Sequence, residues 1–150
     1  MPRRLVYTVG HSNRTLGELI SLLKLYRVKV VVDVRRFPTS RRVPWFRREV
    51  LMELLPVHGI GYIWLGEVLG GFRPRGYEEY MKSEGYRRGI EMLVKVVESA
   101  RGPVAVMCRE RLWFRCHRRF IADTLTSMGY KVMHIIDANR ATPHYRRRRE

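Results

Sequence analysis

The chain has 150 residues, of which 45% are hydrophobic and 29% are charged, and its 30 Lys and Arg against 14 Asp and Glu give a net charge of +16. This length is that of one ordinary domain, and the composition excludes a disordered or membrane-embedded protein. No apolar run reaches the roughly 18 residues that a membrane span needs, and no signal-peptide core follows Met1. We therefore expect a soluble, cytoplasmic protein.

Apolar patterns predict strands and helices in alternation. Strands are expected at residues 5–9, 28–33, 60–65, 104–107 and 131–136, and helices at 16–23, 46–55, 77–82, 86–97 and 115–128. Thr15 and Glu18 have the spacing of a capping box, which predicts the start of the first helix. Alternation of this kind predicts βαβ units, whose right-handed crossovers place helices on both faces of a parallel sheet.

The expected fold is a single three-layer, Rossmann-like α/β domain over residues 1–140, with an open parallel sheet of about five strands. We expect the strand order 3-2-1-4-5, with 2-1-3-4-5 as the alternative. Residues 141–150 form a basic tail with no apolar partner in its Arg146–Arg149 run, and we expect this tail to be disordered. The oligomeric state stays open.

Arginine dominates the charge, with 25 Arg and only 5 Lys. Arg binds phosphate bidentately and stacks on bases, so this bias favours nucleic acid or a nucleotide as the partner and gives no reason to expect a membrane. A GC-rich genome would also raise the Arg content and is the alternative explanation. The absence of Gln and the presence of only two Asn are typical of a thermophile, although the scarcity of Lys is not.

Ionisable residues gather where the predicted strands end. In an open parallel sheet those ends meet at one edge, where ligands bind. The candidate catalytic residues are His11, Asp33, Glu110 and His117. The candidate phosphate or nucleic-acid ligands are Ser12, Arg35, Arg36, Arg109, Trp113 and Arg118.

These residue types suit hydrolysis at a phosphate-bearing substrate. Glu110 or Asp33 would activate water, and His11 or His117 would protonate the leaving group. The alternatives are that His11 only bonds a backbone group and that Asp33 only pairs with a neighbouring Arg. Trp113 is the hardest of the aromatic residues to bury, so we expect it to stack on a base.

Four interpretations of Cys108 and Cys116 remain open. The pair can belong to a metal site with His117, form a disulfide, supply a thiolate at Cys108 beside Arg109, or leave Cys108 as a small buried residue. The spacing lacks the CxxC pair of structural zinc sites, so we expect no metal; no cofactor is identified.

Several blocks of the sequence resemble a known family. These are residues 9–15 (VGHSNRT), 32–38 (VDVRRFP), 107–110 (MCRE) and 116–118 (CHR). In this order they resemble the DUF488 family, a domain of unknown function, and the resemblance runs from about Tyr7 to Ile136. It implies a compact α/β domain and a site, with no established reaction. The sequence departs from the family around Leu112, Trp113 and Phe114, where relatives carry a polar residue and a proline.

Two functions of different classes follow from these observations. The first is an enzyme that hydrolyses a phosphodiester or N-glycosidic bond in nucleic acid or a nucleotide. The second is a DNA- or RNA-binding module without chemistry that uses the same Arg-rich face. A small-molecule site beneath an incidental basic surface is a third choice. Histidines and carboxylates among the arginines favour the enzyme, because a module that only binds phosphate has no need of them.

Overall fold

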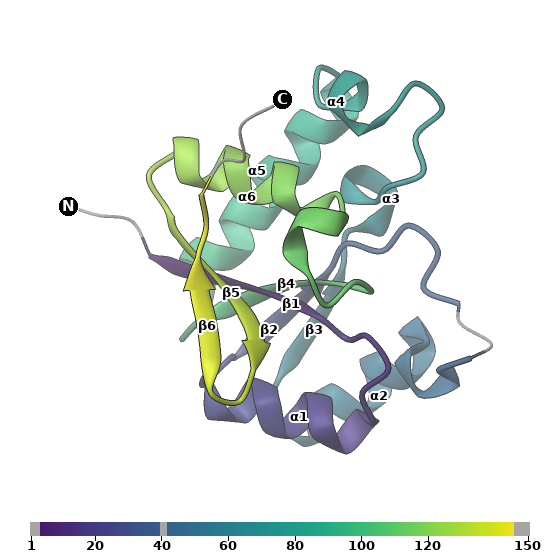
Figure 1. Cartoon of the computed structure of the whole chain (residues 1–150), viewed down its shortest axis with the longest axis vertical. Coiled ribbons are helices and arrows are strands. Elements are labelled where there is room, and N and C mark those ends of the chain that lie inside the picture. The colour runs from purple at the N-terminus through teal and green to yellow at the C-terminus, as the bar shows by residue number, and fades with distance from the viewer. Residues whose placement is uncertain (1–3, 40–41, 146–150) are drawn as a thin grey trace.

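Six strands form one sheet in the computed structural model, which describes residues 4–39 and 42–145 (Figure 1). The strands are β1 (Leu5–Gly10), β2 (Val30–Asp33), β3 (Gly61–Trp64), β4 (Val104–Cys108), β5 (Lys131–Asp137) and β6 (Arg140–Pro143). In the order β3-β2-β4-β1-β5-β6, the first five strands are parallel and β6 runs antiparallel to β5. The expected α/β fold is confirmed, but the sheet has six strands, one of them antiparallel, where about five parallel strands were expected.

The position of β4 differs from both expected strand orders. β4 lies between β1 and β2, and Val104 is in register with Val6 on one side and Val30 on the other. All five residues of β4 are buried, as suits a strand covered on both faces. The consequence for the site is that the carboxyl ends of β1, β4 and β2 lie side by side.

Helices pack against the sheet in two groups (Figure 1). The helices are α1 (Leu16–Leu25), α2 (Arg48–Val57), α3 (Gly66–Leu69), α4 (Tyr77–Tyr80), α5 (Glu84–Ser99) and α6 (Arg118–Ser127), with single 3₁₀ turns at η1 (Pro44–Phe46) and η2 (Trp113–Arg115). Val31 and Met107 belong to the apolar cluster formed with α1 and α2. Val32 and Val106 belong to the cluster formed with α5 and α6. Successive strand residues thus fill opposite faces of the sheet.

Local signals explain where three helices begin and end. The capping box predicted at Thr15 and Glu18 is present at the start of α1. α2 begins at Arg48, after η1, and carries Pro56 in its last turn. α6 begins at Arg118 rather than at residue 115, because Cys116 is extended and separates the helix from η2.

The expected disordered tail is ordered as far as residue 145. Ala141–Pro143 belong to β6, and the backbone N–H of His144 donates to the Val132 carbonyl at 2.9 Å. Sequence reasoning missed β6 because its four residues (RATP) contain no apolar run and follow β5 after a turn of only two residues. Residues 146–150 lie outside the described residues.

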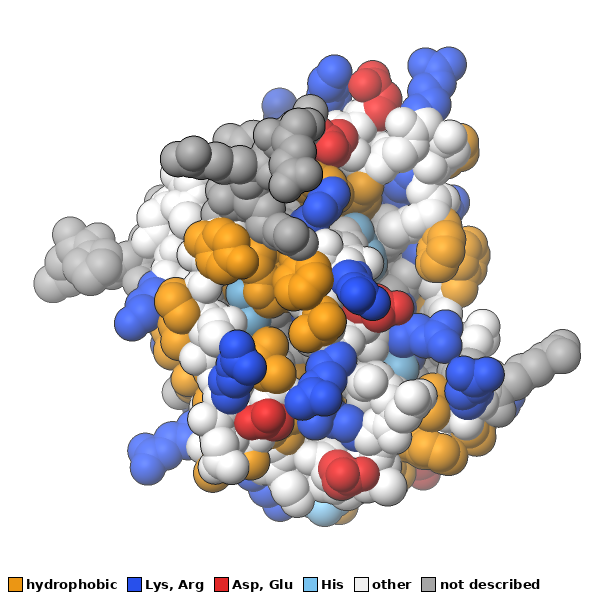
Figure 2. All heavy atoms as spheres, viewed as in Figure 1, with side chains coloured by type: hydrophobic (Ala, Val, Ile, Leu, Met, Phe, Trp, Pro, Cys, Tyr) orange, Lys and Arg blue, Asp and Glu red, His pale blue; other side chains and the backbone are white. Residues whose placement is uncertain are grey.

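The surface is basic and interrupted by apolar side chains. Figure 2 shows many Lys and Arg side chains on the viewed face, with fewer acidic ones and patches of apolar side chains between them. Within residues 4–39 and 42–145, no helix combines the length and the apolar character that a bilayer crossing requires.

Candidate functional site

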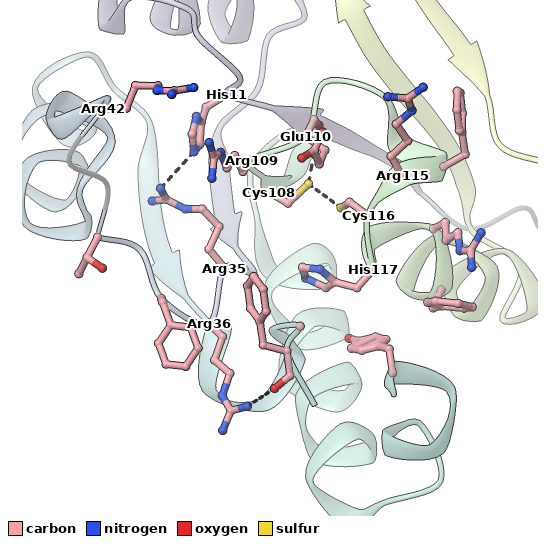
Figure 3. Close-up of a pocket in the computed structure, with 18 residues that line it drawn as sticks. His11, Arg35, Arg36, Arg42, Cys108, Arg109, Glu110, Arg115, Cys116 and His117 are labelled. Carbon is pink, nitrogen blue, oxygen red and sulfur yellow. Dashed lines mark hydrogen bonds between the residues drawn. The ribbon is translucent and has the colours of Figure 1, made fainter. Parts of the chain in front are cut away.

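A pocket of about 910 Å³ opens at the carboxyl end of the sheet. Its walls come from the segments that follow β1, β2 and β4, from the loop before α4, and from the start of α6. The described lining residues are His11, Arg35, Arg36, Phe37, Thr39, Arg42, Gly71, Phe72, Tyr77, Cys108, Arg109, Glu110, Phe114, Arg115, Cys116, His117, Arg119 and Phe120 (Figure 3). This is the edge at which the sequence predicted a site.

The loops that follow β1 and β4 are joined by backbone hydrogen bonds. The backbone N–H of His11 donates to the Cys108 carbonyl at 3.0 Å, and that of Ser12 donates to the Arg109 carbonyl at 2.8 Å. A Cβ atom on Gly10 would overlap the backbone of Glu110, so only glycine allows this approach. His11 and Glu110 are thereby brought to one pocket from positions 99 residues apart in the chain.

Asp33 and Arg35 form a buried, bidentate ion pair. Arg35 Nε donates to Asp33 Oδ1 at 2.9 Å and Nη2 donates to Oδ2 at 2.7 Å. Arg35 also donates to the Phe46 carbonyl at 2.7 Å and to His11 Nε2 at 3.2 Å, so four of its five N–H groups are used. Asp33 is fully buried, accepts a further bond from the Tyr62 hydroxyl, and is not among the described lining residues.

This ion pair raises the pKa of Tyr62 and of Arg35 itself. Burial and the Asp33 carboxylate raise the pKa of Tyr62, which keeps its hydroxyl a donor. Burial would lower the pKa of Arg35, but its hydrogen bonds and charge interaction with Asp33 outweigh burial and raise that pKa. The geometry therefore assigns Asp33 to holding Arg35, and not to activating water.

Both pocket histidines are neutral at pH 7. Burial, followed by the charge of Arg35, lowers the pKa of His11 from 6.5 to about 4, and burial likewise lowers the pKa of His117 to about 4. His117 Nε2–H donates to the Val34 carbonyl at 2.9 Å, and His11 Nδ1–H donates to the Ser12 carbonyl at 2.9 Å. A histidine with such a pKa is not an imidazolium at neutral pH, and this argues against the expected role of leaving-group acid.

Glu110 and Arg109 differ from these buried groups because both are exposed at the pocket wall. Among the described lining residues, Glu110 is the single carboxylate. Its place in the pocket keeps it as the candidate general base. Arg109 lines the same pocket, where its side chain lies next to His11 (Figure 3).

Trp113 is buried, which corrects its expected role as the stacking residue. It is 4% exposed and lies parallel to the His134 ring at a centroid distance of 4.4 Å. His134 bonds Thr8 Oγ1 at 2.5 Å and His144 at 2.8 Å, and His144 bonds Asp123 at 2.6 Å. Trp113 thus packs over a buried hydrogen-bond chain outside the pocket.

Two exposed phenylalanines at the pocket rim are better placed to stack. Phe37 is 62% exposed and Phe72 is 82% exposed, and their ring centroids are 5.9 Å apart. Arg36 donates to the Phe72 carbonyl at 2.7 Å and lies 5.3 Å from the Phe37 centroid. Sequence reasoning missed Phe72, which follows a glycine pair and has the unusual φ of +59°.

The predicted site residues are therefore only partly brought together. His11, Arg35, Arg36, Arg109, Glu110 and His117 line the pocket, whereas Ser12, Asp33, Trp113 and Arg118 are absent from its described lining. Arg118 is fully buried behind the wall, and its backbone N–H donates to Cys116 Sγ at 3.2 Å. No group of three or more His, Cys, Asp or Glu side chains in the described part of the chain is placed to hold a metal ion.

Comparison with known proteins identifies a family whose function is unknown. The family model described as "Domain of unknown function DUF488" matches residues 15–125. No curated protein and no solved structure matches the chain.

Proposed function

The chain belongs to the DUF488 family, a domain of unknown function, and from this premise we propose that it is a hydrolase acting on nucleic acid or a nucleotide in the pocket at the carboxyl end of the sheet. The observation that carries the proposal is the charge of the lining. Among the described residues, six arginines and one carboxylate line a single cavity, and exposed aromatic rings lie at its rim. The proposal includes a three-layer, Rossmann-like arrangement, which the apolar clusters on both faces of the sheet support.

The arginines of the pocket fit a phosphate-bearing ligand. Asp33 balances the charge of Arg35. Of the other described lining residues, five are arginines and one, Glu110, is an acid. The five are Arg36, Arg42, Arg109, Arg115 and Arg119. Such an excess of cations in a cleft attracts polyanions, and guanidinium groups match phosphate oxygens in pairs.

The rim fits the planar part of the same ligand. Phe37 and Phe72 expose their rings beside Arg36, and rings of this kind stack on bases without regard to sequence. A ligand with a phosphate in the pocket would place an adjoining base near this rim. Nucleic acid or a nucleotide has both parts, whereas a simple polyanion has only the first.

Glu110 is the group that we assign to the chemistry. Its carboxylate would take a proton from water as the water oxygen attacks phosphorus or the sugar carbon, and the bond to the leaving group breaks. With His11 and His117 neutral, the arginines would stabilise the negative charge on the leaving group, an oxygen for a phosphodiester and a base nitrogen for an N-glycosidic bond, instead of a histidine protonating it.

Binding is tested with fluorescent single-stranded oligonucleotides over a range of salt concentrations. We expect a log–log slope of about 0.7 for each phosphate neutralised, and a shallower slope for Arg109→Ala. Arg87→Ala is the matched control, because Arg87 is exposed on α5 and pairs with Glu84, away from the pocket. Equal losses in the two variants would show that net charge, and not the pocket, governs binding.

Turnover is tested with Glu110→Gln, which keeps the shape and hydrogen-bonding capacity of the side chain but loses the base. We expect binding to be retained and hydrolysis of the oligonucleotide or nucleotide to fall by about 10²-fold or more. If the parent protein binds but hydrolyses none of the substrates offered, the binding module without chemistry becomes the function.

A further inference from the structure

Two thiols touch in the wall of the pocket. Cys108 is the last residue of β4, and Cys116 follows η2. The loop between them brings Cys116 back to the end of β4. Their Sγ atoms are 2.7 Å apart, both residues line the pocket, and both are free cysteines (Figure 3). The side chains already face each other, as a bond between them requires.

A buried arginine that pairs with no carboxylate of the described residues lies next to the two cysteines. Arg118 is fully buried; its backbone N–H donates to Cys116 Sγ at 3.2 Å, and its Nη2 donates to the Arg111 carbonyl at 3.0 Å. Nε and Nη1 have no hydrogen-bond partner among the described residues, and no carboxylate there forms an ion pair with Arg118. A charge buried in this way favours an anion nearby.

The two thiols differ in their tendency to ionise. Burial raises the pKa of both. At Cys108 the hydrogen bond with Cys116 and the positive charge of Arg118 outweigh burial, so its pKa falls below the ordinary value. At Cys116 burial and the interaction with Cys108 together keep the pKa well above it. Cys108 is therefore the cysteine of the pair that loses its proton more readily.

We propose that Cys108 and Cys116 are a redox-active dithiol that reduces small anionic disulfides entering the pocket, with Cys108 as the attacking residue and Cys116 as the resolving residue. This activity is independent of the proposed hydrolysis, which uses Glu110.

The reaction balances as two thiol–disulfide exchanges. The Cys108 thiolate attacks one sulfur of the substrate, the substrate S–S bond breaks, and the first substrate thiolate leaves. Cys116 then gives its proton to solvent, and its sulfur attacks Cys108 Sγ and displaces the second substrate thiolate. The two cysteines lose two electrons and become a disulfide, while the substrate gains the same two electrons.

The lining of the pocket selects the substrate class. Arg109, Arg115 and Arg119 line the pocket together with the two cysteines, and Phe114 and Phe120 are among the same residues. A disulfide that carries carboxylates and planar groups is attracted by such a surface, whereas a neutral disulfide lacks the electrostatic contribution.

The test uses the full, reduced chain and dithiobis(nitrobenzoate), a dianionic aromatic disulfide whose thiolate product is coloured. We expect two equivalents of product per chain and a protein mass lower by two hydrogen atoms. In Cys116→Ser we expect one equivalent and a stable adduct on Cys108. In Cys108→Ser we expect a rate at least about tenfold lower than in Cys116→Ser, because the remaining thiol is protonated.

Two results would overturn the proposal. One is a parent protein that retains two nitrobenzoate adducts, since the cysteines would then be independent thiols. The other is a Cys108→Ser variant that reacts as fast as Cys116→Ser. The selection of anions is tested with neutral dithiodipyridine: Arg109→Ala should slow the anionic reagent several-fold and leave the neutral one unchanged. Equal effects on both reagents would remove the anionic substrate class.

A pH profile distinguishes an activated thiolate from a merely exposed thiol. In Cys116→Ser the hydroxyl can still donate to Cys108, whereas in Cys116→Ala this donor is lost. Alkylation of Cys108 by iodoacetamide should therefore reach its midpoint below about pH 8.5 in the serine variant and at a higher pH in the alanine variant. Coincident midpoints near the ordinary thiol value would contradict the assigned roles.

Discussion

Two arginines are buried at the carboxyl end of the sheet, and their charges are balanced in different ways. Arg35 has a bidentate carboxylate, a carbonyl and a histidine nitrogen as partners. Arg118 has one carbonyl, and two of its nitrogens have no partner among the described residues. The first arginine holds the wall of the pocket in place; the second leaves positive charge beside two thiols.

The difference shows how to separate a structural ion pair from a reactive one. Asp33 is fully buried and accepts two guanidinium hydrogen bonds from Arg35, so this pair is part of the folded structure. The Cys108 thiol beside Arg118 becomes an anion only when it loses its proton, and the charge of Arg118 lowers its pKa, so this pairing depends on pH. Burial alone does not distinguish these cases, because both arginines are buried; the identity of the anion does.

The largest effect is expected from Asp33→Asn. The substitution leaves Arg35 buried without its counter-charge, and breaking a buried pair on one side costs about 3–5 kcal/mol of the free energy of unfolding. Urea unfolding at pH 7 measures this loss. Glu110→Gln is the control, because Glu110 is exposed and its substitution should change stability by less than about 0.5 kcal/mol. A loss below about 1 kcal/mol for Asp33→Asn would show that the pair is not structural.

Much of the fold follows from patterns that the sequence displays. The five parallel strands and the capping box at Thr15 were predicted from apolar periodicity and local hydrogen-bonding chemistry. The order of the strands was not, because an apolar run such as residues 104–107 says that a strand is buried without saying between which neighbours. β6 was not predicted because it is short, has no apolar run, and is held in the sheet by pairing to β5.

The candidate site was predicted by position more reliably than by the role of each side chain. Topology alone placed His11 and Glu110 at one edge of the sheet. Whether a side chain faces the cavity depends on packing: Trp113 turns inward onto His134, and Phe72 turns outward at the rim. The contact between Cys108 and Cys116 depends on how the loop after β4 returns, and no spacing rule in the sequence gives that path.

A smaller loss of stability is expected at acid pH. It bears on the comparison of the two arginines because a neutral histidine lies beside each of them, His11 beside Arg35 and His117 beside Arg118. The folded pKa of His117 is about 4 and its unfolded value is 6.5, so the unfolded chain binds the extra proton between these pH values. Stability therefore rises with pH through this window and is lost as pH falls below about 6.5. Each such histidine contributes a slope of about 1.4 kcal/mol per pH unit.

His117→Asn should remove its share of that slope, about 3 kcal/mol between pH 6.5 and pH 4 by the same linkage. Urea unfolding of the parent and the variant at a series of pH values measures the difference. His58→Asn is the matched control, because His58 is an exposed histidine at the end of α2. An unchanged slope in His117→Asn would show that His117 is already accessible to protons in the folded state.

The smallest effect is expected from Arg118→Met, and it bears most directly on the difference between the two arginines. The substitution removes a buried cation together with its own desolvation cost, and it loses one hydrogen bond to the Arg111 carbonyl. A Cys108 thiolate left behind takes up a proton, which costs little near neutral pH because an ordinary thiol titrates near 8.5. We therefore expect the free energy of unfolding of the reduced protein to change by less than about 1 kcal/mol at pH 7, against the several kcal/mol of Asp33→Asn.

Urea unfolding of both variants under the same reducing conditions makes the comparison. If Arg118→Met destabilises the chain as much as Asp33→Asn does, the charge of Arg118 is balanced as permanently as that of Arg35, and the contrast between the two arginines is wrong.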